Sequence, residues 1–369
     1  MRITLVSASM NAGGSERVMS LLANAWAAQG HKTSLVTLTD VAEDFYTLSP
    51  SVARIGLSLV KNSINARERV VSGLTRIRSL RRAIRLTQPD VVISFIDQMN
   101  VTTLLALVGT RIPVIISERA SPLRYRISWP WRLLRLITYP FSDALVMQSP
   151  TLINWARRHI RASRIYVIPN PVMTDTAKPG PALGLSPFIL AIGRLTHQKG
   201  FDSLIEAFAL CAQRHPAWRL VILGEGAERG ALEHIITSKR LSGRVLMPGT
   251  QQDTSRWLGQ ADLFVLSSRY EGFPNALLEA MAAGLAVVSF ACESGPPDII
   301  SHEINGLLVP EGDVKALSKA MNGLMRDESL RRSLGTRALE VRDRFAINTI
   351  LAAWDAVIAQ VTSKASAPI

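Results

Sequence analysis

Short apolar runs rich in β-branched residues alternate with helix-like segments along most of this chain. In the first half the runs lie at residues 3–8, 33–38, 91–96 and 114–118, and a helical pattern over 15–28 separates the first two. Continuous apolar runs of this kind are typical of strands that are covered on both faces. The alternation therefore predicts repeated strand–helix–strand units around a parallel sheet.

The alternation stops in a Pro-rich stretch at residues 168–187 and then begins again. New apolar runs occupy residues 188–195, 219–226, 244–250, 261–268 and 285–290, with helical patterns at 201–214, 231–240 and 274–283. We predict an α/β fold of two Rossmann-like domains that face each other across a cleft. The expected segments are a first domain at 1–172, a linker at 173–187, a second domain at 188–345 and a C-terminal helix within 346–369. The sequence leaves open whether that helix packs back on the first domain.

Composition adds one feature to this picture, an uneven distribution of charge. The 369 residues are 47% hydrophobic and 19% charged, which excludes a disordered chain, and the net charge is +13. Residues 1–178 hold 23 Lys+Arg and 10 Asp+Glu, so the whole excess belongs to the first half. Such an excess favours a polyanionic partner, meaning nucleic acid, an anionic membrane or a phosphorylated ligand.

The cysteines and the apolar segments indicate the cellular compartment of the protein. Cys211 and Cys292 have apolar neighbours and no metal-ligand spacing, so we expect reduced core residues in a cytosolic chain. The N-terminus has only a short apolar start, which predicts a strand rather than a signal peptide. The apolar stretch 91–108 is interrupted by Asp97 and Asn100, which argues against a transmembrane span.

Two glutamates in the segment EGFPNALLEAMAAG carry the strongest chemical signal. Glu271 falls in a loop after a predicted strand, and Glu279 lies inside a helix that we expect to have Pro274 in its first turn and to end at Gly284. The two carboxylates are then placed to bind hydroxyl groups, and the free amides around residues 273–276 are anion donors. Taken alone, the same pattern also fits an amphipathic helix with an incidental Glu at each end.

A second segment, GRLTHQKG, places Arg194 and Lys199 after another predicted strand, with glycines on either side. Two cations at the carboxyl end of a strand are able to neutralise a diphosphate without a metal ion. Gly13 and Gly14 form the first strand-to-helix turn and let the backbone approach a phosphate, although a glycine pair alone is a weak signal.

The combination of these segments, in this order, resembles the retaining family 4 glycosyltransferases, which have the GT-B fold. The resemblance covers nearly the whole chain and rests on GGSER at 13–17, GRLTHQKG at 193–200, LVILGEG at 220–226, EGFPNALLEAMAAG at 271–284 and NGLLVPEGD at 305–313. It implies a nucleotide-sugar donor as substrate, no cofactor and no metal.

The resemblance also implies a role for each matching residue. Arg194 and Lys199 would hold the donor diphosphate, and Glu279 would bind the ribose hydroxyls. Glu271 would hold the transferred sugar as a positioning group rather than as a base. The remaining donor contacts would come from the backbone of Phe273, Asn275 and Ala276, from the base-reading segment around Gly249, and from the turn at Gly13 and Gly14.

One segment departs from many relatives, which carry a histidine in the loop that faces the sugar. Here that loop reads SERASP, which resembles the SERxxP segment of a subgroup that extends polyprenyl-diphosphate-linked oligosaccharides with hexose or N-acetylhexosamine. The subgroup implies a UDP-linked donor and places Glu118 and Arg119 in the acceptor or sugar site. A surface ion pair is the alternative for these two residues.

The basic first half predicts a membrane-facing surface. A helical pattern over 67–86 has one apolar face, which arginines largely flank; its residues are Val70, Leu74, Ile77 and Ile84. The candidate contacts with a membrane or a lipid diphosphate are Arg76, Arg78, Arg81, Arg82, Trp129 and Trp131. The two tryptophans also fit a core. We therefore expect a cytoplasmic enzyme that is peripheral on the inner face of the cytoplasmic membrane.

Three other functions compete with this interpretation. A nucleic-acid binder fits the charge, but the chain has no nucleic-acid-binding signature and that function leaves Glu271 and Glu279 unexplained, so we expect no nucleic acid as partner. A nucleotide-sugar epimerase of the same fold, and a transferase with a soluble acceptor, remain open.

Overall fold

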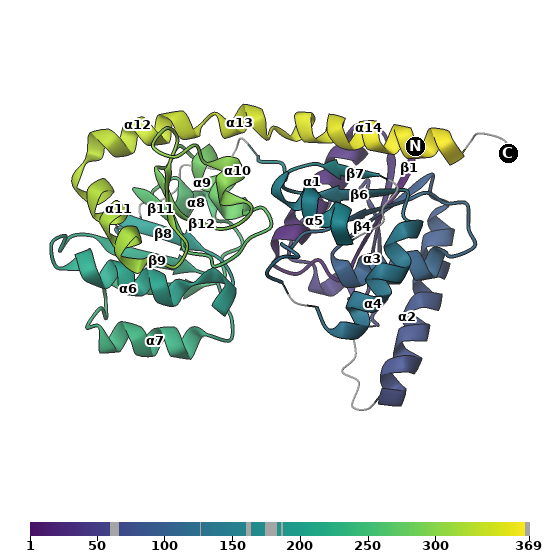
Figure 1. Cartoon of the computed structure of the whole chain (residues 1–369), viewed down its shortest axis with the longest axis horizontal. Helices are drawn as coiled ribbons and strands as arrows, with labels where there is room; N and C mark the ends of the chain where they lie inside the picture. The colour runs from purple at the N-terminus through teal and green to yellow at the C-terminus, as the bar shows by residue number, and fades with distance from the viewer. Residues whose placement is uncertain (60–65, 126, 160–163, 174–182, 186, 366–369) are drawn as a thin grey trace. The chain divides into compact units, whose positions relative to one another are not determined.

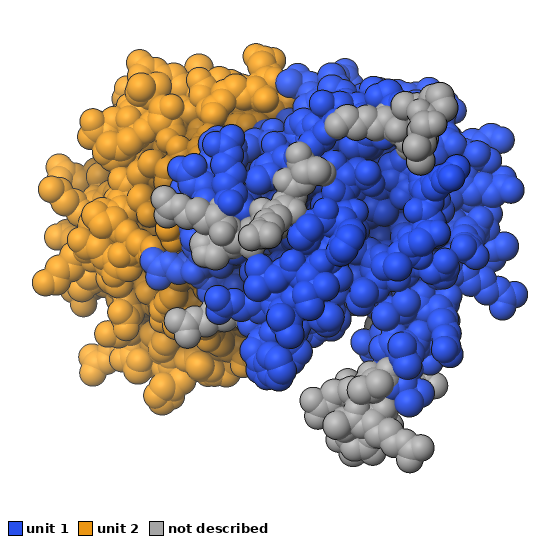
Figure 2. All heavy atoms as spheres, turned by 45° about the vertical axis from the view of Figure 1, so that its right-hand side comes forward, with its two compact units in different colours: residues 1–171, 347–369 blue, residues 172–346 orange. Residues whose placement is uncertain are grey.

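A computed structural model describes residues 1–59, 66–125, 127–159, 164–173, 183–185 and 187–365. The chain divides into two compact units (Figure 2). Unit 1 contains residues 1–171 together with 347–369, and unit 2 contains residues 172–346. The boundary therefore falls one residue before the expected end of the first domain. Most of the expected linker lies outside the described residues.

Unit 1 is built on a parallel sheet of seven strands in the order β3-β2-β1-β4-β5-β6-β7. Figure 1 labels β1, β4, β6 and β7 of this sheet. The strands are β1 (Arg2–Ser7), β2 (Lys32–Thr37), β3 (Ala53–Gly56), β4 (Val91–Phe95), β5 (Val114–Ser117), β6 (Ala144–Met147) and β7 (Ile165–Val167). The helices are α1 (Gly14–Ala28), η1 (Val41–Glu43), α2 (Ala66–Thr87), α3 (Asp97–Leu107), α4 (Trp129–Thr138), η2 (Tyr139–Phe141), α5 (Thr151–His159) and α14 (Ile347–Ala365). The central strands are buried along their length because helices cover both faces.

Unit 2 repeats this architecture with six parallel strands in the order β10-β9-β8-β11-β12-β13. The strands are β8 (Phe188–Ile192), β9 (Arg219–Leu223), β10 (Val245–Gly249), β11 (Leu263–Leu266), β12 (Val287–Ala291) and β13 (Leu307–Pro310). The helices are η3 (His197–Lys199), α6 (Phe201–Ala212), α7 (Arg229–Ser238), α8 (Ser255–Leu258), α9 (Asn275–Ala282), α10 (Pro296–Ile299), α11 (Val314–Arg326), α12 (Glu328–Ala338) and α13 (Val341–Arg344). Cys211 and Cys292 are free and buried, as expected for core thiols.

Both sheets have the same winding, and this confirms the predicted fold class. In each unit the first strand lies inside the sheet, two later strands are added on one side, and the remaining strands are added on the other. The direction of winding therefore changes between β1 and β4 in unit 1 and between β8 and β11 in unit 2. Ligands of open α/β sheets bind beyond the carboxyl ends of the strands at such a point.

The C-terminal helix α14 packs against α1 and completes one face of the unit 1 core. The ring of Trp354 contacts Trp26 edge-on at 6.3 Å and stacks near Phe95 at 6.1 Å. The indole N–H of Trp26 donates to Asp355 at 2.9 Å. Helix α14 thus belongs to unit 1, because its apolar residues are buried in the core of that unit.

Removing the Trp354 ring is expected to destabilise unit 1. The side chain is 1% exposed, so Trp354→Ala leaves a cavity and should lower the free energy of unfolding by about 3–5 kcal/mol. Urea denaturation followed by circular dichroism measures this loss. The matched control is Trp129→Ala, because Trp129 is 75% exposed and its removal creates no cavity.

Candidate active site

Lys199 and Glu271 meet at the carboxyl edge of the unit 2 sheet, where the loops after β8 and β11 are neighbours. The Lys199 Nζ lies 2.5 Å from Glu271 Oε1, and the Ser268 hydroxyl donates to the same oxygen at 2.6 Å. The Glu271 side chain is 7% exposed, so the contact is shielded from solvent. The sequence assigned these residues to diphosphate and to sugar separately, and the structure joins them in one ion pair at the point where the winding changes.

Glycines allow these loops to approach each other closely. A Cβ on Gly193 would lie 3.2 Å from the Lys199 stem, and a Cβ on Gly224 would lie 1.9 Å from the Gly193 carbonyl oxygen. The Gly193 amide donates to Leu223, and the Gly224 amide donates to the Gly249 carbonyl at 3.0 Å. The ends of β8, β9 and β10 are therefore aligned along one edge, so Gly249 lies on the same side of the sheet as Lys199.

Helix α9 carries Glu279, which is 8% exposed, into the interior of unit 2. Pro274 is the residue before the helix rather than part of its first turn, which is a small correction to the expected start. The Phe273 ring packs in the core against Phe345 at 5.4 Å, so the part of Phe273 suited to a ligand is its backbone.

The loop that joins β11 to α9 is held in place by its neighbours. The Ser294 hydroxyl donates to the Glu271 carbonyl at 2.7 Å. Gly295 has a φ of +90°, and a Cβ there would lie 2.9 Å from Pro274. The Asp298 carboxylate accepts the Gly295 amide at 3.0 Å and so caps α10. These contacts fix the backbone that carries Glu271 and the start of α9.

Arg194 lies on the same loop as Lys199 and is exposed. Within the described part of the chain it forms no ion pair, whereas the neighbouring cation Lys199 is matched by Glu271. Arg194 is therefore the cation of this loop whose charge is uncompensated.

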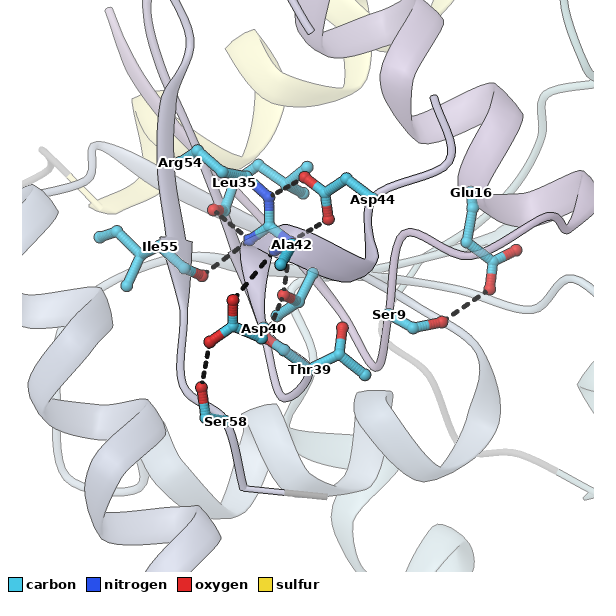
Figure 3. Close-up of polar contacts among 11 residues, drawn as sticks. Ser9, Glu16, Leu35, Thr39, Asp40, Ala42, Asp44, Arg54, Ile55 and Ser58 are labelled. Atoms are coloured by element: carbon cyan, nitrogen blue, oxygen red, sulfur yellow. Dashed lines mark hydrogen bonds and ion pairs between the residues drawn. The ribbon is translucent and has the colours of Figure 1, made fainter. Parts of the chain in front are cut away.

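In unit 1, the turn after β1 holds a glutamate that the sequence analysis did not single out. Ser9 donates to one carboxylate oxygen of Glu16 at 3.4 Å (Figure 3). Ser15 donates to the other oxygen at 2.6 Å. A Cβ on Gly13 would lie 2.2 Å from Glu16 Oε2, so a larger residue at this position would displace the carboxylate. The carboxylate of Glu16 lies over the turn for which the resemblance implied a phosphate.

A second group missed by the sequence analysis is Arg54 on the edge strand β3. Its guanidinium forms two 2.7 Å bonds with Asp44 and a 2.7 Å bond with Thr37 (Figure 3). It also donates to the Ile55 carbonyl at 2.8 Å. These bonds fix the segment after β2 at the carboxyl edge. A single arginine in a short strand gave no signal in the sequence.

Glu118 follows β5 and is 4% exposed, so the interpretation as a surface ion pair is wrong. The Tyr139 hydroxyl donates to its Oε1 at 2.7 Å, and the Asn100 amide donates to Tyr139 at 3.1 Å. Arg135 on α4 lies 3.8 Å from the same oxygen. The sequence did not connect Tyr139, Asn100 or Arg135 with Glu118, because no motif contains them together.

Burial decides the protonation of this carboxyl. It raises the pKa of Glu118 to about 7, and the nearby Asp97 adds to the rise, whereas Arg135 and the Tyr139 hydroxyl oppose it. Burial also raises the pKa of Asp97. Glu118 therefore titrates near neutral pH.

Arg119 points its guanidinium at the face of Phe95, with a distance of 3.5 Å to the ring centroid. Its Nη1 donates to Asn170 at 2.8 Å, and Asn170 also accepts from Gln148. Burial lowers the pKa of Arg119, yet a guanidinium stays protonated at neutral pH. Its Nε and Nη2 are buried and have no hydrogen-bond partner among the described residues, so this edge of the cation lacks an acceptor.

The predicted arginine-rich helix is present as α2, but its two halves differ. Leu80 and Ile84 are buried in the unit 1 core, whereas Leu74 is exposed. Arg76 and Arg81 donate to backbone carbonyls of unit 1. Arg78 and Arg82 are exposed and make no such bond to any residue that the structure describes. Two of the four predicted arginines therefore face solvent as cations.

Helix α4 and the following turn expose an apolar face. Trp129 and Phe141 are 75% and 77% exposed, and Leu133, Leu136 and Ile137 between them are also exposed. Trp131 is instead partly buried and packs against the unit 1 core, which favours the core alternative for this tryptophan. We call the five exposed residues the α4 face. In the part of the chain that the structure describes, no helix is both long and apolar enough to cross a bilayer.

Two family models match the chain, one in each half. The model described as Glycosyltransferase Family 4 matches residues 12–176, and the model described as Glycosyl transferases group 1 matches residues 176–341. A relative agrees with this assignment. It is the GalNAc-alpha-(1->4)-GalNAc-alpha-(1->3)-diNAcBac-PP-undecaprenol alpha-1,4-N-acetyl-D-galactosaminyltransferase of Campylobacter jejuni, which is 30% identical to this chain over 363 residues. The match covers 98% of this chain and 99% of the relative.

Solved structures show the same fold. Sucrose-phosphate synthase from Thermosynechococcus elongatus superposes with a TM-score of 0.86 at 21% identity, over 98% of this chain and 99% of the other. Anabaena Alr3699/HepE in complex with UDP and glucose gives 0.80 at 19% identity, over 97% and 99%. The fold is thus that of the GT-B glycosyltransferases, and the family models together with the Campylobacter relative place this chain in glycosyltransferase family 4. The resemblance seen in the sequence is confirmed, and the chain is a glycosyltransferase.

The raised pKa of Glu118 predicts a pH-dependent cost to stability. The folded state binds the Glu118 proton more tightly than the unfolded chain does. This proton therefore contributes fully to the free energy of unfolding below about pH 4.5, and its contribution is lost as pH rises through about 7. Glu118→Gln should therefore gain stability relative to the original protein across this range, on the order of 3 kcal/mol at full ionisation. Urea midpoints from pH 4.5 to 8 measure the difference. A difference that stays constant with pH would contradict the assignment.

Proposed function

We propose that this glycosyltransferase moves a hexose or N-acetylhexosamine, with retention, from a UDP-linked donor to a growing polyprenyl-diphosphate-linked oligosaccharide of a surface polysaccharide or glycan. The observation that carries the proposal is the shielded Lys199–Glu271 pair where the winding of unit 2 changes. The printed activity of the Campylobacter relative supports the acceptor class, and the UDP complex of HepE supports the nucleotide.

Unit 2 would bind the donor. Arg194 has an uncompensated charge, and Lys199 exchanges its bond with Glu271 for one with the diphosphate, which leaves the Glu271 carboxylate to accept hydroxyls of the sugar. Glu279 would accept the ribose hydroxyls. The backbone of Phe273, Asn275 and Ala276 would meet phosphate or sugar, and the backbone at Gly249 would contact the base.

The chemistry requires little beyond charge stabilisation. The bond between the anomeric carbon and the diphosphate oxygen breaks, and the bond from the same carbon to the acceptor oxygen forms on the same face. The acceptor's proton passes to the departing phosphate oxygen. The negative charge that develops on the diphosphate is stabilised by Arg194 and Lys199 in place of a metal ion, so neither a carboxylate nucleophile nor a metal is proposed.

Unit 1 would bind the acceptor. The free edge of the Arg119 guanidinium and the Glu118 carboxylate supply a donor and an acceptor of hydrogen bonds at the ends of β4 and β5. The turn at Gly13 and Gly14 would approach a phosphate only if Glu16 moves aside, because its carboxylate now lies there.

The same unit carries the surface suited to the membrane that holds such an acceptor. The α4 face is apolar, and Arg124 and Arg132 beside it are exposed. On α2, Arg78 and Arg82 add cations. An apolar face flanked by arginines is suited to the interface of an anionic leaflet, where the rings enter the acyl boundary and the cations meet the headgroups. The proposed location is the inner face of the cytoplasmic membrane.

Replacing the Glu271 carboxylate is expected to abolish transfer while donor nucleotide still binds. Glu271→Ala should lower kcat by about 100-fold or more because the sugar loses its positioning group. UDP should still stabilise the variant against heat, since at 100 times its dissociation constant a ligand adds about 2.7 kcal/mol. Transfer is followed with radiolabelled donor in the presence of EDTA, and product that requires added metal would contradict the proposed mechanism.

The matched control is Glu328→Ala, which removes another ion-paired glutamate of unit 2, far out on the exposed helix α12. The Glu328→Ala variant should transfer sugar at the rate of the original protein.

Incubation with donor alone separates a transferase from an epimerase, because an epimerase converts the sugar without an acceptor. Glu271→Ala activity within a few-fold of the original protein would contradict the assigned role.

Membrane binding should depend on the exposed arginines of α2. Each cation near an anionic leaflet contributes roughly 1 kcal/mol, so Arg78→Glu with Arg82→Glu should weaken binding by about 2 kcal/mol or more, which is about 30-fold. Flotation with phosphatidylglycerol vesicles measures the loss. Arg332→Glu with Arg337→Glu on α12 changes the net charge equally and should bind as before. Equal binding by both double variants would exclude α2 as the contact.

A further inference from the structure

We propose that Arg135 and Tyr139, both delivered by the α4–η2 segment, are positioning residues that hold the Glu118 side chain as a carboxylate for the transfer reaction. This inference rests on the proposed function, because it assigns Glu118 its working state in that reaction. Neither residue belongs to a sequence motif, and both are brought to Glu118 only by the packing of α4 on unit 1.

The hydrogen bonds around Tyr139 run in one direction and end at Glu118. The Asn100 side-chain amide lies 3.0 Å from the Ser117 carbonyl, which only accepts, so the NH2 group of Asn100 must face this side. The same NH2 group lies 3.1 Å from the Tyr139 oxygen and donates to it. The Tyr139 proton is therefore left to be donated to Glu118 Oε1 at 2.7 Å. A carboxyl oxygen that receives this bond is stabilised as an acceptor.

The chain turn that places Asn100 is strained, which indicates that its position is imposed by the fold. Ile96 has a φ of +74°, a region that β-branched residues rarely adopt. Its amide donates to the Ser117 carbonyl at 3.0 Å, and its own carbonyl accepts the Asn100 amide at 2.8 Å. These bonds tie the start of α3 to the end of β5, next to Glu118.

Arg135 supplies the opposing charge. Its Nη1 lies 3.8 Å from Glu118 Oε1, its side chain is buried, and its guanidinium lies 4.9 Å from the centre of the Trp155 ring. The charged groups that face Glu118 are Arg135 from α4 and Asp97 from the start of α3, and the titratable neighbour from η2 is Tyr139. Asp97 and burial favour the neutral form of Glu118, while Arg135 and Tyr139 favour the carboxylate. The balance between these opposing influences sets the fraction of Glu118 that is ionised at neutral pH.

The experiment follows kcat/KM for the acceptor against pH in detergent, with the full-length protein and a radiolabelled UDP-sugar. If the working form is the carboxylate, activity rises with pH through the pKa of Glu118, which lies at about 7. Tyr139→Phe and Arg135→Met should each move this rise to higher pH by roughly 0.5 to 1 unit. Arg135→Lys keeps the positive charge, so in this variant the rise in activity should return to nearly the pH of the original protein.

Matched controls carry the same changes elsewhere in unit 1. Tyr166→Phe removes a hydroxyl that bonds Gln360, and Arg111→Met removes an exposed arginine. Both should leave the pH profile unchanged. A profile that does not move in Tyr139→Phe and Arg135→Met would overturn the proposal.

A second measurement does not need activity. Thermal midpoints of Tyr139→Phe should fall further below those of the original protein as pH rises through 7, because the lost bond stabilises the carboxylate. In a Glu118→Gln background the same change should show no such trend. If no UDP-sugar is transferred but this trend is present, the proposed function fails and the positioning of Glu118 stands. If the trend is absent, the positioning itself is wrong.

Discussion

The parallel direction of all strands is the constraint on which the candidate sites of both units depend. Because every described strand of a sheet ends at the same edge, the loops after adjacent strands are neighbours however far apart they lie in the chain. The ion pair between Lys199 and Glu271 joins residues 72 positions apart only because β8 lies beside β11. In unit 1 the same rule brings the ends of β4, β5 and β6 together around Glu118 and Arg119. The chemistry of each unit is therefore concentrated at one edge by topology alone.

The buried charged groups of the two units differ in how completely they are paired. In unit 2 the buried carboxylate of Glu271 is matched by a lysine and a serine, so it is held ready for exchange with a ligand. In unit 1 the carboxyl of Glu118 and the guanidinium of Arg119 are buried with weaker or incomplete partners. Burial raises the pKa of Glu118 and lowers that of Arg119, so it disfavours the charged form of both groups. Buried groups of this kind cost stability, and they are typical of sites where a ligand supplies what the protein leaves unpaired.

Helix α4 has two faces with different physical roles. Its outer side exposes Trp129, Leu133, Leu136 and Ile137 at helical spacing, while its inner side carries Arg135 into the polar cluster at Glu118. The basic excess of the first half is also divided by the structure. Arg54, Arg119 and Arg135 are committed to partners or rings inside unit 1, whereas Arg78, Arg82 and Arg132 remain at the surface. Net charge alone therefore overstates the number of cations that an anionic leaflet would meet.

The sequence by itself determined the fold class, the family and the loops that carry Arg194, Lys199, Glu271 and Glu118, because strand periodicity and glycine-rich turns are local signals. It could not decide that Trp131 packs partly buried against the core while Trp129 is exposed, since both fit one amphipathic pattern. Nor could it find Tyr139, Asn100 or the Arg54–Asp44 pair, which belong to no motif. Only the tertiary structure decided these points, because burial and hydrogen bonding depend on which elements pack together, and that depends on contacts between residues remote in the chain.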